Sequence, residues 1–144
     1  DVGGLTEAAA RAAQPEAERR GVQLSCLPAE VTACFDPKWT QEALGNLIDN
    51  AIKYTPAGGS VTVSVTPYEL FCRIDVTDTG PGIPEDEQAR IFERFYRSPA
   101  VRDKQGVGLG LYLAREIAAA NGGYIKVTSC PCKGSTFSLF LPMS

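Results

Sequence analysis

The stretch NLIDNAIKYT, residues 46–55, has the spacing of an amphipathic helix but carries two asparagines in its interior. At about 100° per residue, Asn46, Asn50 and Lys53 lie on one face of this helix. The opposite face is apolar, and we expect it to pack on a sheet through Leu44, Leu47, Ile48, Ala51 and Ile52. Asparagine is a weak helix former, and solvated faces normally favour Glu, Lys, Gln and Arg. The aligned amides therefore predict a face that binds a ligand, with an ordinary solvated face as the alternative.

The residue types on this face indicate the chemistry of the ligand. An amide oxygen is a neutral, hard ligand for Mg²⁺, which takes waters and phosphate oxygens as its other ligands. A lysine ammonium beside it can contact a phosphate as a point charge. Asn46, Asn50 and Lys53 together therefore point to a magnesium-bound phosphate.

Composition places the chain among globular domains and narrows its partners. It has 144 residues, of which 44% are hydrophobic and 22% charged, so we expect one domain over residues 1–144. A formal net charge of −3 offers no basic field for a phosphate backbone, so nucleic acid is not expected as a main partner. No apolar run approaches the roughly 18 residues of a membrane span, so we expect no direct membrane contact by this domain.

The cysteines do not form an obvious metal site or disulfide framework. There are five, at positions 26, 34, 72, 130 and 132, without CxxC pairs, and the chain has no histidine. We interpret them as reduced thiols of a cytosolic protein. The sequence CPC at 130–132 leaves a metal or redox pair open as an alternative to ordinary strand residues.

The order of predicted elements indicates the fold class. Helices are expected at residues 5–21, 37–54 and 85–95 and in a segment that ends at Asn121. Strands are expected at residues 22–26 and 30–35, in an antiparallel pair at 61–68 and 70–78, and in two closing segments. This order is neither the βαβ alternation of a parallel sheet nor an all-β pattern. It predicts an α/β two-layer sandwich.

The loop VTDTGPGIP, residues 76–84, places Asp78 at the end of a strand, before Gly80 and Gly82. The glycines free the backbone for a tight turn. A carboxylate held at this position can accept a hydrogen bond from an exocyclic amine. A plain Asp-Gly turn is the alternative.

A second glycine-rich stretch, QGVGLGLYLAREI at residues 105–117, leads into a helix. Without side chains in the way, the backbone N–H groups and the positive helix end can face an anion. The glycine spacing is GxGxG, which matches neither the GxGxxG dinucleotide fingerprint nor the GxxxxGK[ST] phosphate loop. We therefore expect neither of those two sites here.

Taken in order, NLIDNAIKYT, DTGPGIP, IFERFYR, GVGLGLYLAREI and GSTF resemble the N, G1, F and G2 boxes and the final Gly-Ser-Thr segment of one domain family. This is the catalytic, ATP-binding domain of bacterial sensor histidine kinases, in the GHKL superfamily. The match spans about residues 5–142. The resemblance implies the Bergerat fold, a mixed sheet of about five strands backed by three helices. It also implies a nucleotide held between the helical layer and a mobile lid at roughly residues 84–105.

The resemblance also assigns roles to single residues. The family's metal-binding asparagine falls on Asn50, its earlier asparagine on Asn46, and its phosphate-contacting lysine on Lys53. Tyr54 would flank the nucleotide, and Asp78 would bind the adenine amine. The remaining residues of the implied ATP site are Gly80, Gly82, Ile83, Gly106, Val107, Gly108, Leu109, Gly110, Leu111 and Thr136.

The lid would contribute cations to the transfer step. Arg97 and Lys104 are the candidates to meet the γ-phosphate, whereas Phe92 and Phe95 are expected to pack the lid. The implied catalytic residues are Asn46, Lys53, Arg97 and Lys104.

ATP hydrolases of the same superfamily place a glutamate base four residues before the metal asparagine. That place is Asn46 here, and an amide cannot accept the proton of water usefully near neutral pH. We therefore expect the site to hold ATP without rapid hydrolysis. Glu42 could imitate the hydrolase pattern in a shifted register, but Ala51, directly after Asn50, favours the register given above.

A histidine kinase phosphorylates histidine, and this chain has none. We expect the chain to be a fragment of a larger kinase whose histidine-bearing dimerisation hairpin lies outside it, with a response regulator downstream. The parent is expected to be a membrane-anchored receptor with this domain in the cytosol. Three alternatives stay open: an anti-sigma-type serine kinase, an ATP-binding module without transfer activity, and an aspartic protease, which would need a second DTG carboxylate.

Overall fold

The computed structural model describes residues 1–88, 90–92, 110–130 and 134–143. Five strands form one sheet: β1 (Gln23–Cys26), β2 (Ser60–Pro67), β3 (Phe71–Asp78), β4 (Tyr124–Cys130) and β5 (Gly134–Pro142). Their order across the sheet is β1-β2-β3-β5-β4, with β1 parallel to β2 and the other neighbours antiparallel. The predicted antiparallel pair is confirmed as β2 and β3.

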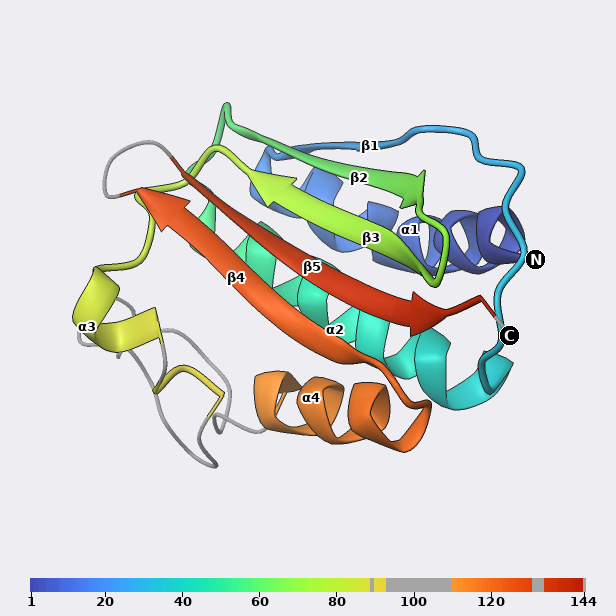
Figure 1. The fold of residues 1–144 in the computed structure, drawn as a ribbon. Coiled ribbons are helices and arrows are strands. Elements are labelled where there is room, and N and C mark those ends of the chain that lie inside the picture. The colour runs from blue at the N-terminus through green and yellow to red at the C-terminus, as the bar shows by residue number, and fades with distance from the viewer. Residues whose placement is uncertain (89, 93–109, 131–133, 144) are drawn as a thin grey trace.

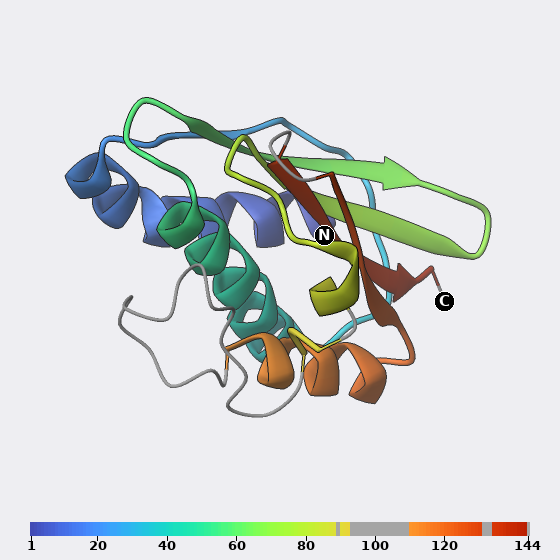
Figure 2. The same ribbon diagram turned by 90° about the vertical axis from the view of Figure 1, so that its left-hand side faces the viewer.

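The long helices all cover one face of this sheet. Figures 1 and 2 show α1 (Val2–Arg20), α2 (Pro37–Tyr54) and α4 (Gly110–Ala120) on that face, while the short α3 (Glu85–Gln88) follows the end of β3. The mixed five-stranded sheet with its helical layer confirms the predicted two-layer sandwich. In the described part of the chain, no helix combines the length and the apolar composition needed to span a membrane.

α2 forms where the sequence predicted it. Asp36 caps its first turn by accepting a hydrogen bond from the backbone N–H of Trp39 at 3.0 Å, and Pro37 is its first residue. The residues predicted to face the sheet are all fully buried: Leu44, Leu47, Ile48, Ala51 and Ile52. The face that carries Asn46 and Asn50 is thereby turned away from the sheet.

One side chain joins the start of α2 to the end of α4. Asn121, which follows α4, accepts a hydrogen bond from the backbone N–H of Asp36 at 2.9 Å and donates one to Thr40 Oγ1 at 2.8 Å. The C-terminal end of α4 is thus fixed at the N-terminal end of α2. The first residue of α4, Gly110, consequently lies beside the middle of α2.

The predicted strand at residues 30–35 is wrong. Val31, Ala33 and Phe35 do alternate towards the core, as the pattern indicated, but the segment makes only isolated backbone bonds. The carbonyl of Val31 accepts from the N–H of Val2, and the N–H of Cys34 donates to the carbonyl of Pro142, each at 2.8 Å. A period of two describes which side chains are buried, whereas a strand also needs a neighbour with which to form a ladder.

Two predicted helices have different limits in the structure. The first begins at Val2 rather than residue 5, because Asp1 caps it by accepting from the N–H of Gly3 at 3.1 Å. Of the helix predicted at residues 85–95, the structure describes α3 and a turn at residues 90–92. Residues 89 and 93–95 lie outside the described part of the chain.

Candidate functional site

The centre of the site is a pair of amides on α2. The Nδ2 atoms of Asn46 and Asn50 are both buried, and neither has a hydrogen-bond acceptor among the residues that the structure describes. A buried polar group left without a partner costs about 1–3 kcal/mol. Rotating either amide about its Cβ–Cγ bond exchanges nitrogen and oxygen, so each position can offer a donor to a phosphate or an oxygen to a cation. The site is therefore built for a polar ligand.

The N-terminal end of α4 faces the first of these amides. A Cβ atom placed on Gly110 would lie 3.8 Å from both Cβ and Cγ of Asn46. The first N–H groups of a helix have no partner within it, and they carry partial positive charge. Leu111 follows Gly110 and packs half-buried against the core. Two kinds of donor, helix N–H groups and asparagine amides, thus meet at one place.

The other end of the site holds a buried carboxylate. Asp78 ends β3 with 6% of its surface exposed, and its Oδ1 accepts a hydrogen bond from the N–H of Gly80 at 2.9 Å. Burial raises the pKa of this carboxyl above its ordinary value, and the N–H groups of Gly80 and Ser135 offset part of that rise. A carboxylate has about four lone-pair sites, so these two donors leave capacity for a ligand amine.

Close backbone contacts bring Asp78 to the end of α2. A Cβ atom on Gly80 would lie 2.8 Å from the carbonyl oxygen of Tyr54, and one on Gly134 would lie 2.1 Å from the carbonyl oxygen of Asp78. Gly134 also has a φ of 92°, and Gly82, within the turn, has a φ of 81°. Only glycine fits these positions without strain. The turn after β3 is therefore held between α2 and β5.

Two serines that the sequence analysis did not identify hold the segment beyond this turn. Ser129 Oγ accepts from the N–H of Ile83 at 2.7 Å and lies 2.9 Å from Ser135 Oγ. The side chain of Gln88 donates to the carbonyl of Ile83 at 3.0 Å. Ile83 is itself buried in the core. The segment that leaves the site towards α3 is thus anchored to β4 and β5.

Ser135 shares a face of the sheet with Asp78, and Thr136 does not. The register pairs Asp78 with Ser135 and Thr77 with Thr136, and directly paired residues point to the same side. Thr136 Oγ1 lies 3.2 Å from Thr77 Oγ1 on the exposed face, away from the helices. Ser135 is therefore the residue of this strand that lies beside the carboxylate, whereas Thr136 lies on the other face, and its role in the ATP site stays a prediction.

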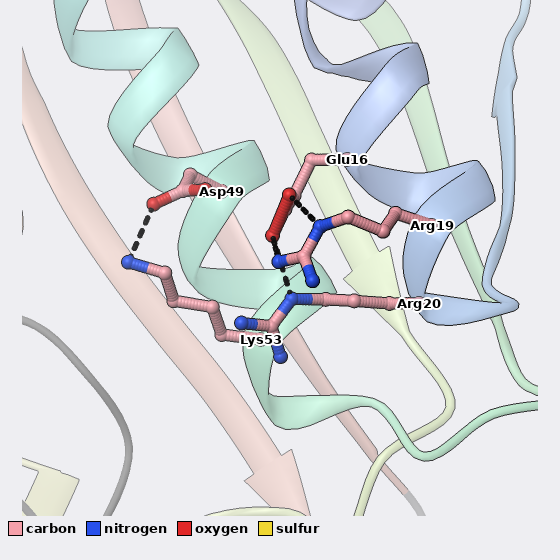
Figure 3. A network of polar contacts seen from close by, with 5 residues as sticks. All are labelled: Glu16, Arg19, Arg20, Asp49 and Lys53. Atoms are coloured by element: carbon pink, nitrogen blue, oxygen red, sulfur yellow. Dashed lines mark hydrogen bonds and ion pairs between the residues drawn. The ribbon is translucent and has the colours of Figure 1, made fainter.

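Lys53 is engaged in an ion pair. Its Nζ lies 3.0 Å from Oδ2 of Asp49, one turn earlier on α2 (Figure 3). Asp49 was not among the residues predicted from the sequence, although a carboxylate four residues before a lysine is a recognised helical pairing. The predicted phosphate-contacting lysine thus already has an acidic neighbour on the same helix.

Some of the remaining predicted residues lie in the described part of the chain, and the others lie outside it. Phe92 is buried and packs edge-to-face on Phe137, with ring centroids 6.1 Å apart, as expected of a residue that packs rather than binds. In the CPC segment, Cys130 is the last residue of β4, and Cys132 lies outside the described residues, so the predicted alternative of a metal or redox pair stays open. The following predicted residues also lie outside the described part of the chain and stay predictions: Phe95, Arg97, Lys104, Gly106, Val107, Gly108 and Leu109.

A model of one protein family matches most of the chain. The family is described as histidine kinase-, DNA gyrase B-, and HSP90-like ATPase, and the match covers residues 35–144. The matched region contains α2, the turn after Asp78, α4 and the two closing strands. Every described residue of the site therefore falls within it.

Similar proteins include the adaptive-response sensory kinase SasA of Rippkaea orientalis (strain PCC 8801 / RF-1), which is 43% identical over 121 residues. That alignment covers 81% of this chain and 30% of the relative. This chain thus spans under a third of the length of the curated relatives it matches first.

Two solved structures have closely similar folds. The mycobacterial sensor histidine kinase MprB has a TM-score of 0.85 and 28% identity, over 99% of this chain and 95% of that one. Full-length ShkA, solved in complex with AMPPNP, has a TM-score of 0.84 and 30% identity, over 100% of this chain and 30% of that one.

The raised pKa of Asp78 predicts how Asp78→Asn changes stability. Because the folded-state pKa lies above the unfolded-state value, the wild type loses stability as pH rises through the folded-state pKa. The asparagine variant has no such loss, so its free energy of unfolding should exceed that of the wild type at neutral pH. The difference should shrink as pH falls towards the ordinary aspartate range.

Urea denaturation at a series of pH values measures both effects. Asp86→Asn, which removes a carboxylate from an exposed position of α3, controls for the change of net charge. An Asp78→Asn protein that is less stable than the wild type at neutral pH would show that the ionised carboxylate stabilises the fold.

Proposed function

Because this chain belongs to the family of histidine kinase-, DNA gyrase B- and HSP90-like ATPases, we propose that it binds Mg²⁺-ATP and donates the γ-phosphate to a histidine on a separate dimerisation domain. The observation that carries this proposal is the pair of buried amides, Asn46 and Asn50, the first of which lies beside the first residue of α4. A phosphate group at this helix end would accept from such donors, and an amide turned about its Cβ–Cγ bond would present its oxygen to the accompanying cation.

The two ends of the site suggest how ATP would lie. The turn of Asp78 meets α2 at Tyr54, and Asn46 lies about 12 Å back along the axis at 1.5 Å per residue. The adenine amine would donate to Asp78, with Gly80 and Ile83 shaping the pocket around the base. The phosphates would reach Asn46 and the N-terminal end of α4, so the nucleotide would run antiparallel to the helix.

Asn50 would supply an amide oxygen to Mg²⁺, with phosphate oxygens and water as the other ligands. When bound, the ion would neutralise charge on the transferring phosphate. Among the described residues there is no group of three or more His, Cys, Asp or Glu that could hold a metal ion. A single asparagine oxygen is a weak site by itself, so cation binding would depend on the nucleotide.

Transfer from this site would rest on positioning and electrostatics. Lys53 would contact the phosphates, and Arg97 and Lys104 would add positive charge from the lid, as the family resemblance suggests. Asn46 stands where the superfamily's hydrolases keep a glutamate, so water would have no base to activate it. The site would therefore keep ATP for an incoming histidine.

The acceptor must lie outside this sequence, because the chain has no histidine. We propose that this domain acts on the histidine-bearing dimerisation domain of its parent kinase, with a response regulator as the next acceptor. Support comes from the relatives, which are sensory kinases more than three times as long as the matched part. We further propose a cytosolic position within a membrane-anchored receptor, without direct contact to membrane or nucleic acid.

The role of Asp78 predicts a preference for ATP over GTP. GTP presents a carbonyl oxygen where ATP has an amine, so it loses a buried hydrogen bond and faces the carboxylate with a second acceptor. A lost buried contact costs about 1–3 kcal/mol, which corresponds to roughly a five- to 150-fold difference in Kd. Titration with each nucleotide in the presence of Mg²⁺ measures this ratio, and equal affinities would remove Asp78 from the role.

Asn50→Ala should weaken Mg²⁺-ATP binding while the fold survives, because Asn50 lies on the face of α2 turned away from the sheet. A hydrogen bond or ligand contact to a charged group contributes about 1.5–3 kcal/mol, or roughly 10- to 150-fold in Kd. Calorimetry measures the binding and circular dichroism the fold. Gln41→Ala, at an exposed position of the same helix, should bind as the wild type does. Wild-type affinity in a folded Asn50→Ala protein would refute the assignment.

The chain alone should bind ATP but neither label itself nor hydrolyse ATP appreciably. The missing general base corresponds to roughly 10²- to 10⁴-fold in rate. Radiolabelled γ-phosphate should transfer only when a matching histidine-bearing hairpin is added, and the label should be lost in acid.

Two outcomes of this assay would contradict the proposal. Brisk hydrolysis that Glu42→Gln abolishes would show the shifted register of an ATP hydrolase. Acid-stable label on serine or threonine of the chain would place it with the serine kinases.

A further inference from the structure

The ion pair of Asp49 and Lys53 lies on the same side of α2 as the two amides. Lys53 Nζ is 3.0 Å from Asp49 Oδ2, and the two side chains are 28% and 48% exposed. At 100° per residue, Asp49, Lys53, Asn46 and Asn50 fall within an arc of about 100°. The ion pair therefore borders the proposed phosphate site.

The pair draws the ammonium group back along the helix. Asp49 lies one turn nearer the N-terminus than Lys53 (Figure 3), in the direction of Asn46, which lies beside Gly110. Helical side chains lean towards the preceding turn, so this contact needs no unusual conformation. Without Asp49, no ion pair found in the described part of the chain would fix the flexible lysine side chain over this turn. The ion pair with Asp49 thus holds the Lys53 ammonium towards the end of the site where the phosphates are proposed to lie.

The ammonium keeps the capacity to bind phosphate while it is paired. It has three N–H donors, and one bond to Asp49 leaves two. A carboxylate so close to a polyphosphate would repel it, unless a cation lay between them. Lys53 is placed to be that cation, in contact with Asp49 on one side and open to phosphate oxygens on the other.

Resting on the ATP site proposed above, we propose that Asp49 is a positioning residue, which through its ion pair holds the Lys53 ammonium beside Asn50 for the phosphates of ATP. Asp49 would act on the nucleotide only through the lysine. The effect of Asp49 on nucleotide affinity is therefore conditional on Lys53.

A stabilising role without a ligand is the competing explanation. An ion pair at i, i+4 and a cation near a helix C-terminus both stabilise a helix. Glu16 on α1 forms ion pairs of this kind with Arg19 and Arg20 (Figure 3). Because these residues lie outside the proposed site, Glu16→Gln is the matched control for loss of a helical ion pair.

The test measures the affinity of the chain for ATP, with and without Mg²⁺, in a double-mutant cycle. The proteins are the wild type, Asp49→Asn, Lys53→Met, the double variant, Asp49→Glu and Glu16→Gln. Asp49→Asn should weaken ATP binding about two- to fivefold, the size of effect expected for a partly exposed ion pair. Asp49→Glu should restore binding, and Glu16→Gln should bind as the wild type does. In the Lys53→Met background, Asp49→Asn should cause no further weakening.

Two results would overturn the role of Asp49. One is wild-type or tighter ATP binding by Asp49→Asn, and the other is an equal loss with and without Lys53. ATP binding by the wild type distinguishes failure of the proposed role of Asp49 from failure of the proposed function. A wild type that binds no ATP refutes both, whereas one that binds ATP without the dependence on Lys53 refutes the inference alone.

Discussion

The packing of α2 against the sheet is the constraint on which the site depends. Its apolar face is fully buried, with Leu44, Leu47 and Ile48 at no measurable exposure. Turning the helix by one residue would carry this face towards solvent and the amides towards the core, where they would find no partners. Hydrophobic burial on one side therefore sets the positions of Asn46 and Asn50 on the other. Their donors, which have no acceptor among the described residues, are placed where a ligand could reach them.

Two other segments are brought to this helix: the N-terminal end of α4 and the turn after β3. Asn121 fixes the far end of α4, so that the near end, at Gly110, meets Asn46. At the other end of α2, Gly80 allows the turn after β3 to touch the helix terminus. At Gly80 a side chain would separate the two backbones, whereas a Cβ atom at Gly110 would make only an ordinary contact with the Asn46 side chain. The site thus combines helix N–H groups, amides and a buried carboxylate along one face of α2.

The sequence predicted the structure correctly where the periodicity of the apolar residues alone determined which face of an element is buried. The faces of α2 followed from a spacing of 3.6 residues, and the β2–β3 pair followed from alternation and a short turn. Residues 30–35 show the limit, because alternation marks burial without revealing whether a partner strand exists. Asp49 could have been found from its spacing to Lys53. Ser135 could also have been identified, since the alternation along β5 places it on the core face and Thr136 on the other face. Its position beside Asp78, however, depends on the register between β3 and β5.

We propose that ATP lies along α2, with its base at Asp78 and its cation at Asn50. A crystal structure of the chain with a non-hydrolysable ATP analogue and Mn²⁺ in place of Mg²⁺ tests this most directly, because anomalous scattering locates the ion. We expect an anomalous peak at bonding distance from Oδ1 of Asn50 and the adenine amine within hydrogen-bond distance of the Asp78 carboxylate. A peak away from Asn50, or a base that does not contact Asp78, would contradict it.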